Sequence, residues 1–357
     1  MTSFDLARQR LRNQQLSSPH FTRASDVVKW LGAVQAQDYY GAKWGLGQRM
    51  LSASDEDIER AFAEGKILRT HIMRPTWHFV SPADIRWMLK LTAPRVNACN
   101  SHYYRRLELD ERVFRQSNKA LAAALRGGKH LTRDALRNVL QHGGISTSGL
   151  RLVYILARAE LDGVICSGAR QGKQFSYALL DERALRTKDL SRDESLAELA
   201  RRYFASHGPA TVQDFVWWSG LTVADAKAGV EMTKRRLMQE VVDGQTYWLT
   251  ASSPVARGSS QAAYLLPTYD EYLIAYKDRS VALDSIHGKQ AIRRNPVFSS
   301  SIVIAGRVVG SWKRSFKENS VVVTIIPFSS LGKSERQSVD EAAQRYGSFL
   351  NMRVVVA

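Results

Sequence analysis

The chain has 357 residues, of which 44% are hydrophobic and 9% aromatic, so we expect several packed units and exclude a disordered chain. Lys and Arg number 51 against 34 Asp and Glu, which gives a formal net charge of +17. This excess favours a polyanionic partner, nucleic acid first, because cationic side chains neutralise phosphates. A basic soluble protein or a binder of membrane surfaces has the same charge, so charge alone does not identify the partner.

The cysteine content and the N-terminal segment bear on the cellular compartment. Cys99 and Cys166 are far apart and lack CxxC spacing, which excludes a disulfide framework and a zinc cluster. The segment MTSFDLARQRLRNQQL is charged and has no apolar core of a signal peptide, and no later stretch approaches about 18 apolar residues. We therefore expect a cytoplasmic, nucleoid-associated protein that neither is secreted nor spans a membrane.

Residues 1–81 are predicted to form a first winged helix module. Two strands are expected in KILRTHIM and TWHFVS, separated by Arg74-Pro75. The predicted helices that precede them cover 4–15, 25–34, a stretch after Tyr40, and 54–64. Helices followed by a two-stranded hairpin are the elements of a winged helix.

Residues 82–127 are predicted to be connecting helices, interrupted by Pro94. They carry the basic aromatic run HYYRRLELDER. Arg105 and Arg106 in this run are placed to touch phosphates, and a solvated helix face is the alternative interpretation.

Residues 128–185 and 192–250 repeat one plan, and they are predicted to be winged helix modules 2 and 3. In module 2, Thr132 caps RDALRNVLQ, a second helix starts from Ser148, and the strands VIC and FSYALL flank the turn GARQGKQ. In module 3, Thr211 and Thr222 cap two helices, and QEVVDGQTYWLT forms a hairpin through Asp243-Gly244.

The segment 262–357 differs in composition and is predicted to be a separate α+β domain. Its apolar runs YLLP, SSSIVIAGRVVGSWKRSF and SVVVTIIPF indicate strands of a small barrel-like sheet, followed by a helix over 334–348 and the strand MRVVVA. The Ser-rich stretch 251–261 is the expected linker. The fold class is therefore α+β, with tandem winged helix modules and a C-terminal β-rich domain.

The second helix of a winged helix has the size of a DNA major groove, so three modules on one basic chain predict binding to duplex DNA. Winged helices also mediate contacts between proteins, and a fold alone does not establish a function. A protein-interaction scaffold without DNA affinity therefore stays as an alternative.

Two amides, Gln35 and Gln37, lie just beyond the apolar helix predicted over 25–34. Residues two apart point about 200° apart on a helix but share a face in an extended segment. To act together, the two amides must therefore lie where the helix has ended. A solvated or backbone-capping pair is the alternative interpretation.

The motif Gln35-Ala36-Gln37 resembles the catalytic Gln-x-Gln motif of the AlkZ-like DNA glycosylases, a family of the winged helix superfamily. The resemblance extends to RPTWHFVSPADIRWML at 74–89 and LLPTYDEYLIAYKDRS at 265–280, so it reaches both ends of the chain. The sister branch resembling YcaQ carries Gln-x-Asp, and Gln37 places this chain in the other branch. The resemblance implies a DNA glycosylase for alkylated purines, including bulky adducts and, in some members, interstrand crosslinks.

The residue types agree with that chemistry. An amide has no useful pKa near 7, so Gln35 and Gln37 can position a water beside C1′ but cannot act as a general base. Positioning suffices when the leaving purine already carries a fixed positive charge from N7-alkylation, whereas an unmodified base requires a proton donor. We therefore expect a glycosylase without a cofactor. It is expected to be monofunctional, because lyase activity needs a nucleophilic amine and no lysine stands out as a candidate.

Candidate DNA contacts lie on two hairpins. In the first module, Arg69 and His71 share one strand face by alternation, and His78 is as readily a buried structural histidine as a DNA contact. The complete set of candidate DNA contacts is Arg69, His71, Arg74, His78, Arg170, Gln171, Lys173 and Gln174. The two histidines have no Cys, Asp or Glu at ligand spacing, so no metal site is expected.

The segment PTYDEYLIAYKDR contains Asp270 and Glu271, the carboxylates that are the next candidates for a catalytic role. The alternative is a structural cluster in which Asp270 or Asp278 pairs with Arg279 and tyrosines pack around the pair. The expected partner is double-stranded DNA with an alkylated purine, and the chain is expected to be a monomer. A non-catalytic winged helix transcriptional regulator is the alternative function.

Overall fold

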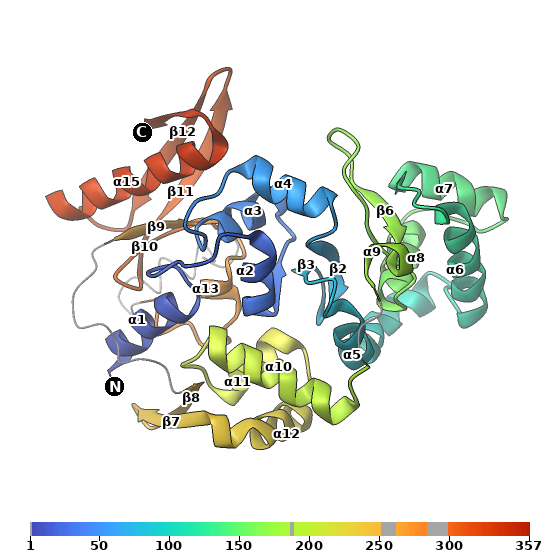
Figure 1. The fold of residues 1–357 in the computed structure, drawn as a ribbon, viewed down its shortest axis with the longest axis horizontal. Coiled ribbons are helices and arrows are strands. Elements are labelled where there is room, and N and C mark those ends of the chain that lie inside the picture. The colour runs from blue at the N-terminus through green and yellow to red at the C-terminus, as the bar shows by residue number, and fades with distance from the viewer. Residues whose placement is uncertain (1, 186–188, 251–261, 284–298) are drawn as a thin grey trace. The chain divides into compact units, whose positions relative to one another are not determined.

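The computed structural model describes residues 2–185, 189–250, 262–283 and 299–357 (Figure 1). The chain forms two compact units. The first contains Met1–Glu59, Ala197–Trp218 and Thr222–Ala357, and the second contains Arg60–Leu196 and Ser219–Leu221. The expected linker at 251–261 lies outside the described residues, and the boundaries predicted for the individual modules stay a prediction.

The first unit begins with short helices. The predicted helix 25–34 is shorter than expected, because Gly32 has a φ of +83° and the chain then becomes extended. The elements in order are α1 (Ser3–Asn13), α2 (Ala24–Leu31), strand β1 (Ala33–Gln35), α3 (Tyr39–Gly47) and α4 (Asp55–Ala63).

The second unit opens with the antiparallel hairpin of β2 (Leu68–Ile72) and β3 (Arg74–Val80). The predicted break at Arg74-Pro75 was wrong by one residue. The chain turns at Met73, whose φ is +62°, and Arg74 and Pro75 belong to β3.

The connecting helices are α5 (Ile85–Arg106) and α6 (Glu111–Leu125). The prediction that Pro94 interrupts the first was also wrong, because α5 is a single helix of 22 residues with Pro94 inside it. A proline lacks the N–H that would bond to the carbonyl of Lys90, so one hydrogen bond of the helix is missing there. The buried residues of α5 on either side keep the helix in place.

The second module has the winged helix order. Its sheet has the strand order β4-β6-β5, and the loop between β5 and β6 projects beyond helices α7 and α8 (Figure 1). Thr132 caps α7 as predicted, since its side chain accepts from the backbone N–H of Ala135. The elements are β4 (Leu131–Thr132), α7 (Arg133–His142), α8 (Arg151–Leu161), β5 (Ile165–Ser167), β6 (Ser176–Leu179) and the short α9 (Leu180–Arg183).

The third module repeats this order. The predicted hairpin turn is confirmed, because Asp243 and Gly244 have φ values of +50° and +74°, as a two-residue turn of this type requires. The caps at Thr211 and Thr222 are confirmed as well. The elements are α10 (Arg192–Ser206), α11 (Val212–Ser219), α12 (Val223–Thr233), the 3-10 turn η1 (Lys234–Arg236), β7 (Leu237–Val242) and β8 (Gln245–Thr250).

The C-terminal part of the first unit is a curled five-stranded sheet, which confirms the predicted α+β class with a barrel-like domain. The strand order is β13-β12-β11-β10-β9, and the final helix packs against β9 and β13. The elements are β9 (Ala263–Leu266), α13 (Glu271–Ile274), β10 (Ser301–Ile304), β11 (Arg307–Lys317), β12 (Ser320–Pro327), α15 (Lys333–Leu350) and β13 (Arg353–Val356). Among the described helices, none is both long and apolar enough to cross a membrane.

Candidate active site

The two amides of the motif lie beyond the end of helix α2, as the spacing predicted. Gln35 is the last residue of β1, and Gln37 lies in the bend before α3. They differ in accessibility: Gln35 is 6% exposed, whereas Gln37 is exposed. Asp38 caps α3 by accepting from the backbone N–H of Gly41 at 3.1 Å. Gln37 therefore stands at the positive end of a helix dipole, at the surface of the unit.

A buried carboxylate holds the backbone of the motif. The backbone N–H of Gln35 donates to Oε1 of Glu271 at 2.8 Å, and the indole N–H of Trp218 donates to Oε2 at 3.0 Å. Glu271 is only 1% exposed. Both carboxylate oxygens thus accept N–H donors in a buried environment, which fixes the backbone position of Gln35.

His207 lies beside the same carboxylate, with its Nε2 atom 3.4 Å from Oε2 of Glu271. Complete burial lowers the pKa of His207, and the neighbouring carboxylate only partly opposes this effect. The imidazole also stacks on Tyr203 at 5.0 Å between ring centroids. His207 is therefore a neutral packing group at pH 7 that protects Glu271 from solvent.

The predicted pairing of Asp270 or Asp278 with Arg279 was wrong. Asp270 forms a bidentate ion pair with Arg49, at 2.9 Å and 2.7 Å, and both side chains are buried. Asp278 accepts from the backbone N–H of Ser280, and Arg279 donates to the backbone carbonyl of Leu273. The partner of Asp270 is thus 221 residues away, two residues beyond the C-terminal end of α3.

The Arg49–Asp270 pair connects the helix that follows the motif to the segment that contains Glu271. Arg49 also donates to the carbonyl of Gly45 and to the side chain of Gln14. Trp44 on the same helix donates to the carbonyl of Leu265 at 2.7 Å. Helix α3 is therefore fixed on the C-terminal part of the first unit, and the motif lies at its N-terminal end.

In the second unit, Arg69 and His71 are held by protein groups. The Arg69 guanidinium lies 4.3 Å from the Trp77 ring centroid and 4.6 Å from that of Phe175, and the residue is 8% exposed. His71 contacts the Glu160 carboxylate through its backbone N–H and its ring. The strand face predicted to carry Arg69 and His71 is therefore a partly buried cluster, in which the Arg69 guanidinium lies between two aromatic rings.

The other two candidates on this hairpin also differ in exposure. His78 is 0% exposed, and its Nδ1 atom lies 2.9 Å from the carbonyl oxygen of Thr76. The structure thus shows the buried, hydrogen-bonded histidine of the alternative interpretation, and a DNA contact would require His78 to be uncovered. Arg74 is half-buried, with its Nη2 atom 3.5 Å from Nε2 of His78.

The tip of the second module's wing is accessible. Gln171 and Gln174 pair through their backbones at 3.0 Å and 3.1 Å, and Gly172 between them has a φ of +59°. Lys173 and Gln174 are exposed, whereas Arg170 is half-buried over the Phe175 ring at 5.5 Å. Gln171 is exposed as well, and its side chain donates to the carbonyl of His130 at 2.8 Å.

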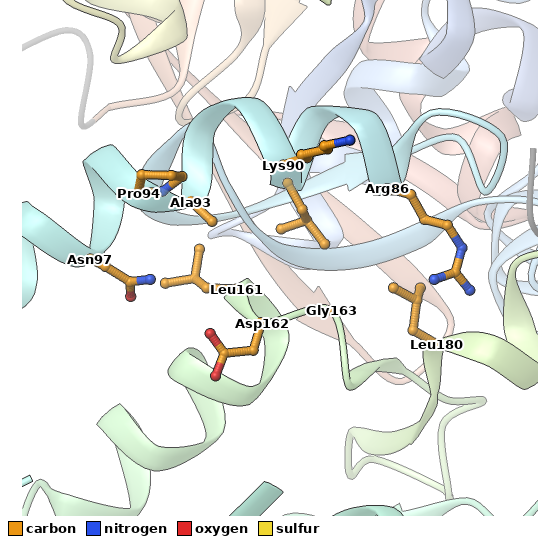
Figure 2. A pocket seen from close by; sticks show the side chains of 10 residues that line it. Arg86, Lys90, Ala93, Pro94, Asn97, Leu161, Asp162, Gly163 and Leu180 are labelled. Carbon is orange, nitrogen blue, oxygen red and sulfur yellow. The ribbon is translucent and has the colours of Figure 1, made fainter. Parts of the chain in front are cut away.

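A cavity of about 380 Å³ lies between α5 and α8 in the second unit (Figure 2). Arg86 and Lys90 extend from α5, and Asp162 lies across from them at the end of α8. Arg86 is committed to Asp181 at 2.6 Å and Asp162 to Arg158 at 2.8 Å. None of the predicted site residues lines this cavity, and within the described ranges His, Cys, Asp and Glu form no cluster suited to a metal ion.

Sequence reasoning missed three residues that support the motif: Arg49, His207 and Trp218. Their contacts with the Asp270-Glu271 segment join positions 53 to 221 residues apart. A weak signal was present in Arg49, a cation in a largely apolar helical stretch without an acidic partner one turn away.

Helices followed by a two-stranded hairpin recur along the chain in the order of a winged helix, an arrangement that binds DNA or other proteins. The profile of the family "DNA glycosylase AlkZ-like" matches residues 28–349. The chain belongs to this family and is therefore a DNA N-glycosylase, as the motif predicted.

Similarity to a glycosylase of Streptomyces sahachiroi appears in both sequence and structure. The chain is 26% identical over 336 residues to a protein named "Interstrand DNA cross-link repair glycosylase", and the match covers 89% of each chain. It also resembles the solved structure of the Streptomyces sahachiroi DNA glycosylase AlkZ, with a TM-score of 0.82 and 23% identity over 100% of both chains. The latter likeness confirms the fold.

Proposed function

We propose that this glycosylase hydrolyses the N-glycosidic bond of N7-alkylated purines in duplex DNA during base excision repair. The observation that carries the proposal is the placement of Gln37, an exposed amide at the N-terminus of α3, beside a Gln35 whose backbone is fixed by buried Glu271. A pair of side-chain amides suits the positioning of a water molecule and cannot protonate a leaving base.

The reaction balances without an acid catalyst. Water held by Gln35 and Gln37 adds its oxygen to C1′ as the bond from C1′ to N9 breaks, and both electrons of that bond enter the cationic purine. The base leaves as a neutral molecule, the sugar gains a hydroxyl group, and one proton passes to solvent. The amides stabilise the water and the developing positive charge at C1′ through their oxygen atoms.

The substrate range includes bulky adducts and interstrand crosslinks in this proposal. Support comes from the relative of 26% identity, which is named for crosslink repair. An activity without cofactor agrees with the chemistry, because a cationic purine needs neither a metal nor a redox group to depart.

Release of N7-methylguanine from a defined duplex tests the proposal. The wild-type chain should release the base, and Gln35→Ala together with Gln37→Ala should lower the single-turnover rate by about 10²-fold or more. A protein that releases no modified base, and whose double variant keeps every measurable phenotype, would instead be the non-catalytic regulator. Strong preference for one operator sequence would support the same conclusion.

A further inference from the structure

The first compact unit contains a second cavity, of about 540 Å³, whose lining residues all belong to that unit. It is bordered by the start of α3, the first turn of α4, strand β11 and the C-terminal end of α15. Its volume lies within the range of about 300–1,000 Å³ that small-molecule sites occupy.

The cavity begins next to the catalytic motif. Arg314, which lines it, has its Nη2 atom 3.9 Å from Oδ1 of Asp38, the residue that directly follows Gln37. Tyr40, three residues after Gln37, also lines the cavity. The lining of the cavity therefore starts three residues beyond Gln37, on the helix that follows the motif.

Four of the twelve lining residues are aromatic. Tyr40 is 48% exposed and Phe316 is 58% exposed, and both border the cavity together with Tyr346 and Phe349. Exposed aromatic rings at a cavity offer flat surfaces on which a nucleobase stacks. Phe316 lies on a strand of the sheet, yet its ring is exposed. An exposed ring adds little to the packing of the core, so packing alone does not explain a large aromatic residue at this position.

The charge around the cavity is opposite to that of the whole chain. Two carboxylates line it, Asp55 and Glu56, against one cation, Arg314. Asp55 binds the Lys43 ammonium at 2.7 Å, whereas Glu56 is exposed at the rim. Glu56 therefore offers a negative charge that attracts a bound cation.

We propose that this cavity receives the alkylated purine itself, turned out of the duplex, with its positively charged ring stacked on Tyr40 and Phe316 beside Glu56. The inference rests on the proposed function and adds to it a binding site for the leaving base. The volume leaves room for a large alkyl substituent, so the same cavity accounts for the acceptance of bulky adducts.

Equilibrium binding tests the inference without hydrolysis. The probes are three duplexes that carry, at one position, N7-methylguanine on a 2′-fluoro sugar that resists cleavage, the uncharged isostere 7-methyl-7-deazaguanine, or guanine. The wild-type chain should bind the cationic duplex most tightly. Tyr40→Ala and Phe316→Ala should each reduce that preference over guanine by about tenfold, the effect of losing one stacked ring.

Glu56→Gln tests the effect of charge separately from that of shape. It should reduce the preference for the cationic base over its uncharged isostere. The preference for the isostere over guanine should stay unchanged. The matched control is Val355→Ala, an exposed apolar residue of the same sheet that does not line the cavity. Unchanged melting temperatures should show that all variants fold.

The inference is overturned if Tyr40→Ala and Phe316→Ala keep the wild-type preference for the cationic base, or if they weaken binding to all three duplexes equally. The two proposals fail separately. If the wild-type chain releases the base but the variants keep the binding preference, the cavity proposal is wrong and the hydrolysis proposal stands. If the variants lose the preference but the wild-type chain releases no base, the hydrolysis proposal is wrong and the cavity proposal stands.

Discussion

The backbone N–H of Gln35 donates to the buried carboxylate of Glu271 at 2.8 Å, so a residue of the C-terminal domain fixes the motif from beneath. Glu271 does not face solvent, so we expect it to affect activity through the position of the strand end rather than through contact with substrate. The same carboxylate accepts from Trp218, so each of its oxygens has a fixed donor.

Glu271→Gln should therefore lower activity more than it lowers substrate binding. A glutamine has one acceptor oxygen and turns an NH₂ group toward one of the two donors, which leaves a buried hydrogen bond to a charged group unmade, at about 2 kcal/mol. We expect the single-turnover rate to fall about tenfold or more while affinity for undamaged duplex stays constant. Glu341→Gln on the exposed side of α15 is the matched control. Equal losses of both properties would show general destabilisation instead.

The ion pair between Arg49 and Asp270 should be essential for the fold of the first unit. Asp270→Asn leaves a buried guanidinium without its charge partner, and removal of one member of such a pair costs about 3–5 kcal/mol. Urea unfolding monitored by tryptophan fluorescence measures this loss. The double variant Arg49→Met with Asp270→Asn should regain part of the stability, and a single variant as stable as wild type would contradict the prediction.

Local signals predicted most of the secondary structure. The caps at Thr132, Thr211 and Thr222 and the turn at Asp243-Gly244 depend on residues within four positions, and all are confirmed. The strand after α2 was missed, because the run that continues to Val34 remains apolar and a short buried strand has the same pattern as a helix end.

Long-range pairings were beyond the sequence. The choice of Arg49 rather than Arg279 as the partner of Asp270 depends on burial, and nothing in the local pattern distinguishes the two arginines. In the same way, strand alternation predicted that Arg69 and His71 share one face. It could not predict that Phe175 and Glu160 pack against these two side chains.

Stability should depend on pH through His207. Because burial lowers its pKa in the folded chain, the unfolded chain binds the proton more readily, and stability should fall as pH drops below the ordinary value of about 6.5. Unfolding by urea between pH 7 and pH 5 measures this slope. His207→Gln should reduce it, whereas His142→Gln at an exposed helix end should leave it unchanged. An identical slope in both variants would assign the effect to other groups.

The wing tip should contribute non-specific affinity for DNA. Lys173 is exposed at the tip, so Lys173→Ala should weaken binding to every duplex sequence alike and reduce the slope of log K against log salt by about one. Titration of a labelled duplex at several salt concentrations measures both. Lys333→Ala at the start of α15 is a control of equal charge change. A loss confined to damaged duplex would contradict the assignment of Lys173 to the phosphate backbone.

The pH profile of base release should identify the chemical role of Gln37. An amide does not titrate, so the wild-type rate on N7-methylguanine should stay constant between pH 5 and pH 8 if positioning is its only contribution. Gln37→Asp keeps an oxygen that can hold water, and it should retain measurable release with a decline at acidic pH, near the ordinary carboxyl pKa of about 3.9. Gln37→Ala should lose about 10²-fold at every pH, because nothing replaces the lost oxygen. A wild-type rate that falls steeply within this range would mean that a titrating group takes part in bond cleavage, and the positioning mechanism would then have to give way to general acid or base catalysis.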